Sequence, residues 1–239
     1  MCANVAQKIV MGIFLIHSIG DAYVAMQWQV GKTTRELRSP MESPPQPQAQ
    51  PILNIVGDKV ALGPRRRDLL AVYLQWINDF EVTRTLAIGL HPVTWEAEEA
   101  WYEHTSQSER DTVVFTVYER LTMRPIGNTD LRNIDYVHRT AEFGILLGEK
   151  DCWGKGYGTE TTALMLDYGF TGLGLHNIML RVFTFNERGI RAYTRAGFCV
   201  MGHRRQAHRL GGRVYDVVYM DCLATEFQSP VLRRLLPEG

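Results

Sequence analysis

The sequence predicts a layered α/β (α+β) domain in which helices flank one mixed sheet of about seven strands. Two patterns carry this prediction. Apolar residues that alternate with polar ones indicate strands, and apolar residues three and four positions apart indicate amphipathic helices. In chain order they give a strand, two helices, three strands, a helix, a strand, a helix and two strands. This order is typical of layers packed around a single sheet.

The expected elements begin at residue 52 and end at residue 223. Thr94 is the expected N-cap of the second helix, and Gly211-Gly212 marks a hairpin between the last two strands. Strands are expected at 52–62, 112–119, 125–134, 140–147, 177–185, 198–206 and 214–223, and helices at 65–80, 96–104, 155–173 and 188–195.

Residues 39–51 are rich in Pro and Gln and have almost no apolar side chains, so they predict an extended linker. The linker separates an N-terminal arm, residues 1–38, from a folded domain at 52–227 and a tail at 228–239. Met41 lies near the start of the compact part, so one hypothesis is that translation begins there. Mass spectrometry of the natural protein tests this hypothesis, and the role of the arm stays open.

Charge and composition argue against several classes of protein. The 26 Lys and Arg residues balance 26 Asp and Glu residues, so no nucleic-acid partner is expected. The longest apolar run, residues 9–16, is far shorter than the roughly 20 residues of a membrane-spanning helix, so no membrane partner is expected. The four cysteines are scattered, which predicts reduced thiols, no metal site and a cytoplasmic location.

Three glycines, Gly154, Gly156 and Gly158, lie between an expected strand and an expected helix. Glycine allows a ligand close to the backbone and permits positive φ, and the first N–H groups of a helix are unpaired and attract anions. The segment therefore predicts a phosphate or pyrophosphate site. A tight turn without a ligand is the alternative from these residues alone. A P-loop is excluded because Lys155 and Thr159 are not adjacent.

A second segment begins with Asn186 at the end of a strand and continues into a helix that contains Tyr193. Gly189 and Tyr193 are four residues apart and share one helix face. A tyrosine hydroxyl that faces a thioester can donate a proton to the leaving thiolate. From spacing alone, a half-buried core tyrosine is the alternative.

Together the two segments resemble the GNAT superfamily of acetyltransferases, in particular the branch with ribosomal-protein N-terminal acetyltransferases and polyamine acetyltransferases. The family's pyrophosphate motif, Gln/Arg-x-x-Gly-x-Gly/Ala, corresponds to residues 153–158, with Trp153 in place of the usual Gln or Arg. The resemblance extends over about residues 52–227 and leaves the arm out. The family's next motif matches Asn186, Tyr193 and Gly197-Phe198, with Gly189 where Ser or Ala is usual.

The resemblance implies a V-splayed sheet in which strands 143–147 and 178–184 part at one end to receive the pantetheine arm. It implies acetyl transfer from acetyl-CoA to a primary amine by direct attack in a ternary complex, with no metal. Tyr193 is the implied general acid. The implied cofactor contacts are Ile145, Leu146, Leu147, Trp153, Gly154, Lys155, Gly156, Tyr157, Gly158, Thr159 and Asn186.

The amine must lose a proton before it attacks, so a carboxylate near the splay is the expected base. Glu142 is the first candidate, followed by Asp130 and Asp135. An ion pair or a surface charge is the alternative for Glu142. A covalent route through Cys152 is not expected because no histidine arrangement accompanies it.

The acceptor stays open: a protein N-terminus, a polyamine, an antibiotic or another small amine all fit, and a homodimer is left open. A basic cluster near the last hairpin suggests an anionic group on the acceptor or the cofactor's 3′-phosphate, with a charged strand edge as the alternative. Two rival interpretations are a non-catalytic acyl-CoA-binding regulator and an interaction domain. The basic cluster consists of Arg204, Arg205, His208 and Arg209.

Overall fold

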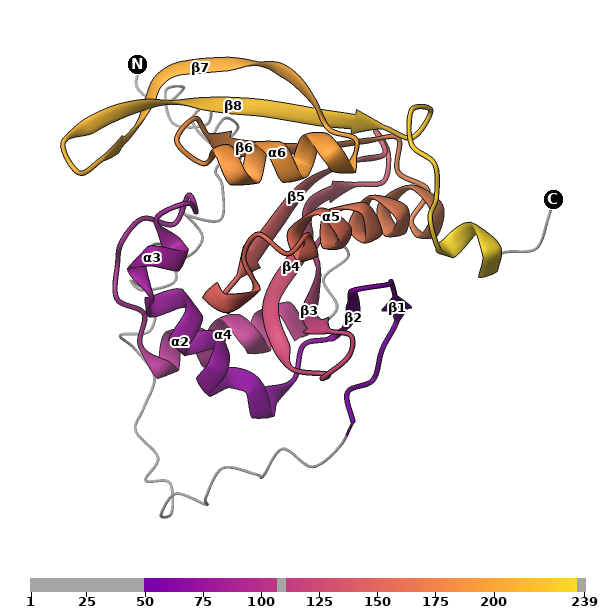
Figure 1. Cartoon of the computed structure of the whole chain (residues 1–239), viewed down its shortest axis with the longest axis horizontal. Helices are drawn as coiled ribbons and strands as arrows, with labels where there is room; N and C mark the ends of the chain where they lie inside the picture. Colours follow the sequence, from indigo (N-terminus) through magenta and orange to yellow (C-terminus); the bar gives the residue numbers. More distant parts are fainter. Residues whose placement is uncertain (1–49, 107–110, 236–239) are drawn as a thin grey trace, which may run out of the picture.

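The computed structural model describes residues 50–106 and 111–235 (Figure 1). The predictions for the arm, for most of the linker and for Met41 therefore lie outside the described residues. One eight-stranded sheet has the order β1-β2-β3-β4-β5-β6-β8-β7. The strands are β1 (Ile55–Val56), β2 (Val60–Pro64), β3 (Val113–Glu119), β4 (Pro125–Asp135), β5 (Thr140–Leu147), β6 (Asn177–Phe183), β7 (Cys199–Leu210) and β8 (Arg213–Leu223).

Four of the α-helices lie where the sequence predicts them, whereas the short helix at 80–83 and the turns at 150–152 and 232–235 were not predicted. The α-helices are α2 (Leu70–Asn78), α3 (Phe80–Thr83), α4 (Trp95–Ser106), α5 (Tyr157–Asp167) and α6 (Glu187–Ala196). The shorter turns are the 3₁₀ helices η1 (Arg67–Leu69), η2 (Lys150–Cys152) and η4 (Leu232–Leu235), and the π-helical turn η3 (Tyr168–Gly172).

The predicted fold class is confirmed, but the strand predicted at 52–62 is a hairpin. The Gly57 amide donates to the Val60 carbonyl at 2.9 Å, and Ile55 pairs with Leu62 across the turn. This hairpin raises the number of strands in the described chain from the expected seven to eight. The Gly57-Asp58 pair is a turn signal that the alternation of apolar residues obscured.

The helix predicted at 65–80 ends early because Asp79 begins a new one. The Asp79 backbone is extended, and its side chain accepts a hydrogen bond from the Glu81 amide at 2.9 Å, which caps α3. Thr94 is the N-cap of α4 as expected, since its hydroxyl accepts from the Ala97 amide at 3.3 Å. The segment between α3 and α4 is thereby free to form a wall of the site described below.

The sheet splays between β5 and β6, which form its parallel pair. Their pairing begins at Thr140 with Asn177 and ends at Glu142 with Met179, after which the strands part. The other neighbouring strands of the described sheet pair antiparallel. The expected V-shaped opening is therefore present, and it exposes one edge of β5 beyond Glu142.

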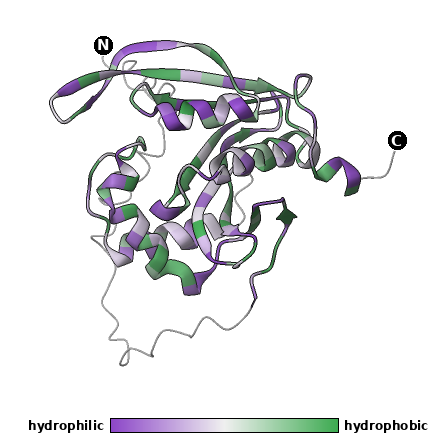
Figure 2. Ribbon diagram, viewed as in Figure 1, coloured by the Kyte–Doolittle hydropathy of each residue, from purple (hydrophilic) through white to green (hydrophobic). Residues whose placement is uncertain are grey.

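Helices cover both faces of the sheet, and the side chains of β5 alternate between them. Ile145 and Leu147 pack into the main core with α5 and α6, whereas Leu146 packs against the core that contains Tyr73 and Trp76 of α2. Figure 1 shows α5 and α6 side by side, with α2 and α4 in a separate group. Figure 2 shows hydrophilic and hydrophobic residues alternating along α6, whose apolar side joins the core.

The first part of the tail predicted to begin at residue 228 belongs to the folded domain, which corrects the boundary placed at 227. The fully buried Asp167 carboxylate accepts hydrogen bonds from the Val231 and Leu232 amides at 2.9 and 2.8 Å. Leu232 also packs on the main core. This segment therefore closes one end of α5.

Two general expectations can be compared with the described residues. None of the helices in 50–106 and 111–235 is long and apolar enough to cross a membrane. Over the same residues, no group of His, Cys, Asp and Glu side chains is arranged to hold a metal ion. Cys152, Cys199 and Cys222 are free thiols.

Candidate active site

The glycine loop before α5 has the geometry of an anion site. Gly154 and Gly156 have φ angles of +79° and +89°, which disfavour any residue with a Cβ. Space around Gly154 is open, with no atom within 4 Å of an added Cβ. Gly156 caps α5 without a capping side chain. The first amides of α5 are therefore left for an anionic ligand, so the loop fits a pyrophosphate.

Trp153 fixes the loop to the end of β5, which explains its place in the motif. Its indole N–H donates to the Leu147 carbonyl at 2.9 Å. The Arg188 guanidinium lies over the indole ring, 3.9 Å from its centroid, an attractive cation–π geometry. A cation of α6 therefore lies against the residue at the first motif position.

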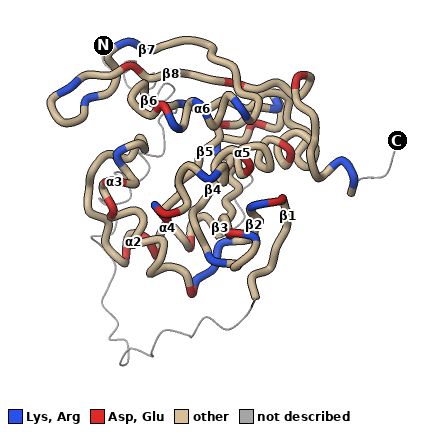
Figure 3. Tube along the Cα trace, viewed as in Figure 1, with Lys and Arg blue, Asp and Glu red and all other residues tan. Residues whose placement is uncertain are grey.

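A cavity of about 360 Å³ lies between this loop, the end of β5 and α6; we call it the cofactor cavity. It contains three arginines and no carboxylate, so its charge favours an anionic ligand such as a nucleotide. Figure 3 shows the basic residues along α6. The lining residues are Val82, Thr85, Leu86, Ile145, Leu146, Leu147, Cys152, Trp153, Gly154, Gly156, Gly158, Thr159, Asn186, Arg188, Gly189, Arg191, Ala192, Tyr193 and Arg195.

Two residues predicted as cofactor contacts do not line this cavity. The Tyr157 hydroxyl donates to Glu119 at 2.6 Å, so its side chain is directed to β3. Lys155 is exposed, and its carbonyl accepts from the Lys59 ammonium at 3.2 Å. Their side chains have structural and surface roles, whereas the predicted contact through the backbone N–H groups of Lys155 and Tyr157 stays a prediction.

Asn186 caps α6, and this role explains the departure at Gly189. The Asn186 side-chain oxygen accepts from the Gly189 amide at 3.0 Å. A Cβ at Gly189 would lie 2.6 Å from the Asn186 side-chain nitrogen. A Ser or Ala at this position would therefore require the Asn186 side chain to shift from this cap. Asn186 still lines the cavity and has its amide N–H groups available for a ligand.

Tyr193 lies where the cofactor cavity meets a second cavity, and it lines both. Its ring stands edge-on to Phe143 and Phe198, at centroid distances of 6.1 and 6.3 Å. Burial raises the pKa of Tyr193 to about 12. Within the described residues, its hydroxyl has no hydrogen-bond partner. Tyr193 is therefore a protonated donor at neutral pH with its proton uncommitted.

The second cavity, also about 360 Å³, lies on the α2–α4 face of the sheet; we call it the acceptor cavity. Asn128, Asp130 and Glu142 line it from β4 and β5, and Arg181 and Arg204 from β6 and β7. The loop after α3 and Trp101 of α4 form the opposite wall. The two cavities share Thr85, Leu86, Ile145, Leu146, Asn186 and Tyr193.

The surroundings of Glu142 argue against its predicted role as the base. It is 8% exposed, and hydrogen bonds from Arg132 and Arg181 reach one carboxylate oxygen at 2.8 Å each. Although burial raises its pKa, the two guanidinium groups outweigh burial and hold the pKa below its usual value of 4.5. A carboxylate stabilised in this way accepts a proton poorly, so the ion-pair alternative describes Glu142 better.

The other two candidate bases differ from each other. Burial raises the pKa of Asp130 above its usual value of 3.8 and outweighs the ion pair with Arg132 at 2.8 Å, and Asp130 lines the acceptor cavity. Asp135 instead accepts hydrogen bonds from the Val137 and His138 amides at 2.8 Å in the β4–β5 turn, and it lines neither cavity. Asp130 is therefore the better-placed carboxylate, and Asp135 is corrected to a turn residue.

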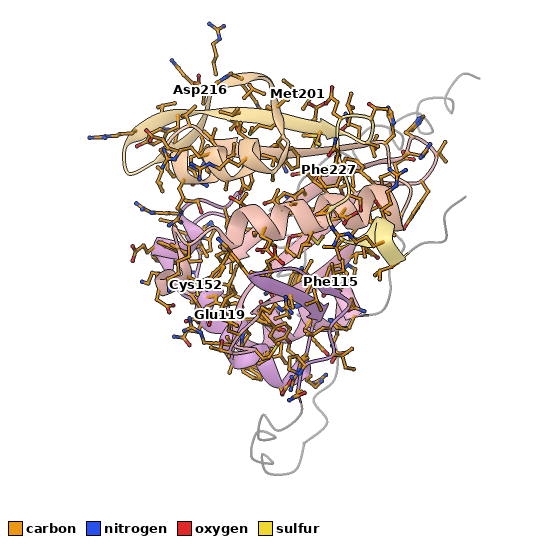
Figure 4. The ribbon with its side chains drawn as sticks, turned by 45° about the vertical axis from the view of Figure 1, so that its right-hand side comes forward. Phe115, Glu119, Cys152, Met201, Asp216 and Phe227 are labelled. Carbon is orange, nitrogen blue, oxygen red and sulfur yellow. The ribbon has the colours of Figure 1, made fainter. Side chains whose placement is uncertain are left out.

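Cys152 lines the cofactor cavity without the features of a nucleophile, as the sequence indicates. Its thiol accepts from Arg124 at 3.1 Å, and burial raises its pKa. Figure 4 labels it at the loop, apart from Asp216 and Met201 on the outer hairpin. Because the thiol is held protonated and no histidine is bonded to it, a covalent route is not supported.

Sequence reasoning missed the three arginines of α6 and the loop after α3. Arg188, Arg191 and Arg195 recur at three- and four-residue spacing on one helix face, which is a signal that the sequence does contain. The segment that contributes Thr85 and Leu86 to both cavities has no comparable pattern. Its position depends on the packing of α3 and α4, so it was not predictable from local residues.

Known proteins match both the sequence and the fold. The family model described as acetyltransferase (GNAT) domain matches residues 62–199. The chain belongs to the GNAT acetyltransferase family. With its cofactor cavity, this GNAT chain is an enzyme that transfers an acetyl group from acetyl-CoA to an amine. A non-catalytic regulator is not favoured.

Individual relatives agree with this assignment. The chain is 35% identical to spermidine N(1)-acetyltransferase of Vibrio cholerae serotype O1 over 133 residues, which are 55% of this chain and 74% of the relative. It is 30% identical to human alpha/beta-tubulin-N-acetyltransferase 9 over 156 residues, 60% and 74% of the two chains. A crystal structure of the Vibrio cholerae spermidine enzyme with CoA and spermine superposes with a TM-score of 0.65 at 27% identity, covering 70% of this chain and 97% of that one.

Proposed function

We propose that this GNAT enzyme acetylates the primary amine of a small molecule, with acetyl-CoA in the cofactor cavity and the amine in the acceptor cavity. The junction of the two cavities carries this proposal. Ile145, Asn186 and Tyr193 line both, at the point where β5 and β6 part. Direct attack in a ternary complex requires two sites that meet, because the reacting atoms must approach closely.

The residues that hold acetyl-CoA are assigned from the charge and shape of the cofactor cavity. The first amides of α5 and the guanidinium groups of Arg188, Arg191 and Arg195 face its phosphates. The free edge of β5 beyond Glu142 offers backbone groups to the pantetheine. When bound, acetyl-CoA supplies the acetyl thioester.

Two residues are assigned to proton transfer. Asp130 takes a proton from the acceptor ammonium, because burial gives it a raised pKa and it lines the acceptor cavity. The Tyr193 hydroxyl gives a proton to the thiolate sulfur that leaves, since its own pKa of about 12 keeps it protonated. Glu142 is assigned to hold Arg132 and Arg181 in place.

The relatives named for spermidine support a small-molecule acceptor. The relative named for tubulin supports a protein N-terminus as the second candidate. The predicted domain boundaries of the arm and linker, the homodimer and the cytoplasmic location stay predictions of the sequence.

The test is to incubate the purified chain with acetyl-CoA and a panel of amines while measuring thiol release, and to identify acetylated products by mass spectrometry. The panel contains diamines, polyamines, amino acids, aromatic amines and short peptides. We expect thiol release that requires an amine and yields its acetylated form. Coenzyme A binding in calorimetry without transfer to any amine would contradict the proposed reaction.

A further inference from the structure

The carboxylates of the acceptor cavity are all paired with arginine. Glu98 bonds to Arg65 at 2.8 Å, and both side chains are almost fully buried. The other two carboxylates, Asp130 and Glu142, alternate with arginines in a row of ion pairs, each 2.8 Å long. These contacts join Asp130 to Arg132, Arg132 to Glu142 and Glu142 to Arg181.

One further cation lines the cavity without such a partner. Arg204 of β7 is exposed, and no carboxylate pairs with it in the described parts of the chain. His208, four residues further on, adds no charge at neutral pH because burial lowers its pKa. The three carboxylates are neutralised by Arg132 and Arg181 of the cavity and by Arg65 behind it, so Arg204 is left as an additional positive charge.

This balance is unsuited to a polyamine. A polyamine brings several ammonium groups, each of which must exchange water for an acceptor of comparable strength. Here guanidinium groups at 2.8 Å already neutralise the carboxylates, so the cavity offers no net negative charge to a ligand with several ammonium groups. An additional cation would also be repelled by Arg204.

Two neutral side chains of the cavity, Asn128 and His208, have a buried polar atom without a hydrogen-bond partner, and the atom of Asn128 is an oxygen that can accept from an amine. The side-chain oxygen of Asn128 is buried without a hydrogen-bond partner, and Asn128 pairs with Leu146 of β5 beside the cavity junction. An amine N–H that donates to this oxygen would satisfy it. Asn128 therefore marks a position for the amine end of the substrate, in the cavity that Asp130 and Tyr193 also line.

Resting on the proposed function, we propose that the acceptor is a monoamine whose other end carries a carboxylate, and that it is not a polyamine. Asn128 receives the amine, and Arg204 receives the carboxylate. Arg204 is thus a specificity-determining residue in this enzyme. Arg205, its neighbour on β7, lines neither cavity and has no such role.

The test uses three substrates of similar length that differ at one end: 4-aminobutanoate, butylamine and 1,4-diaminobutane. The kcat/KM of the wild-type enzyme is expected to be highest for 4-aminobutanoate and lowest for 1,4-diaminobutane. Arg204→Gln should lower the ratio of kcat/KM for 4-aminobutanoate over butylamine about tenfold, because one charged hydrogen bond is lost. Arg205→Gln is the matched control and should leave this ratio unchanged.

Arg204→Glu gives the sharpest outcome, because it should invert the preference and favour 1,4-diaminobutane. Two results would overturn the inference: wild-type preference for 1,4-diaminobutane or spermidine, or equal effects of the changes at 204 and 205. Loss of coenzyme A affinity in Arg204→Glu, measured by calorimetry, would place Arg204 on the cofactor side and also overturn it. In either of the first two cases the proposed function would stand, whereas absence of transfer to every amine would remove both.

Discussion

The cofactor cavity and the acceptor cavity are neighbours of similar volume, yet they are built differently. The cofactor cavity takes most of its lining from one stretch of chain, residues 145–159, and from α6. The acceptor cavity draws its lining from α2, α4, α6, the loop after α3 and the strands β3 to β8. The difference teaches that a local sequence motif can define the binding site for acetyl-CoA. The binding site for the amine instead depends on how the whole domain folds.

The largest expected effect comes from a side chain in the glycine loop. Gly156→Glu introduces a Cβ at a φ of +89°, 3.0 Å from the Lys59 ammonium, and a negative charge at the anion site. We expect affinity for coenzyme A to fall by about 4 kcal/mol, or about a thousandfold. Calorimetry measures this change.

Gly174→Glu is the matched control for that substitution, because Gly174 also has positive φ and open space but lies outside both cavities. It should leave coenzyme A affinity intact. If both variants bind coenzyme A as the wild type does, the loop is not the anion site and the comparison between the cavities fails.

Tyr193→Phe tests the junction between the cavities. Loss of the hydroxyl should lower kcat about 300-fold while coenzyme A affinity is kept, since a general acid contributes to chemistry and not to ground-state binding. Because the pKa of Tyr193 is about 12, the hydroxyl stays protonated below about pH 10, and wild-type kcat should not fall there through loss of this proton. Tyr168→Phe, at a half-buried tyrosine outside both cavities, is the control. Unchanged turnover in Tyr193→Phe would refute the assigned acid.

Asp130→Asn tests the proton acceptor on the acceptor side. We expect kcat/KM at neutral pH to fall about a hundredfold. The wild-type profile should rise with pH through the raised pKa of Asp130, and the variant should lack this rise. Initial rates from pH 5 to 9 show both effects, and a variant that keeps the wild-type profile would exclude Asp130 as the base.

Glu142→Gln should act on stability more than on chemistry. Replacing the carboxylate that holds Arg132 and Arg181 is expected to lower the free energy of unfolding by about 2 kcal/mol at neutral pH. Because the folded pKa lies below the usual 4.5, this contribution is complete above pH 4.5 and is lost as pH falls through the folded pKa. Denaturant titrations at pH 7 and in acid should therefore show the gap between wild type and variant shrinking, and a constant gap would contradict the ion-pair role.

Arg188→Ala has the smallest expected effect. It removes one of three cavity arginines and the cation–π contact with Trp153, so the KM for acetyl-CoA should rise about fivefold. The rise should shrink at high salt because screening weakens the lost attraction. Arg213→Ala, at the exposed start of β8, is the control and should change neither the KM for acetyl-CoA nor its dependence on salt. A similar rise of KM in both variants would show that only the net charge of the protein matters.

The sequence predicted the donor side better than the acceptor side for a physical reason. Gly154, Gly156 and Trp153 are adjacent in the chain, so the requirements of positive φ and a helix start are visible in local residues. The charge state of Glu142 depends on Arg181, 39 residues away, and no local pattern announces that pairing. Likewise, alternation alone did not separate β1 from β2 at Gly57.

The arrangement on two faces of one sheet also bears on evolution. Asn128, Asp130 and Glu142 project with Leu146 on the α2–α4 face, whereas Ile145 and Leu147 pack toward α5. Substitutions at Asn128, Asp130 or Glu142, which line only the acceptor cavity, can change which amine is accepted while the lining of the cofactor cavity is kept. Relatives with different acceptors, such as those named for spermidine and for tubulin, can thus arise while the same nucleotide-binding site is kept.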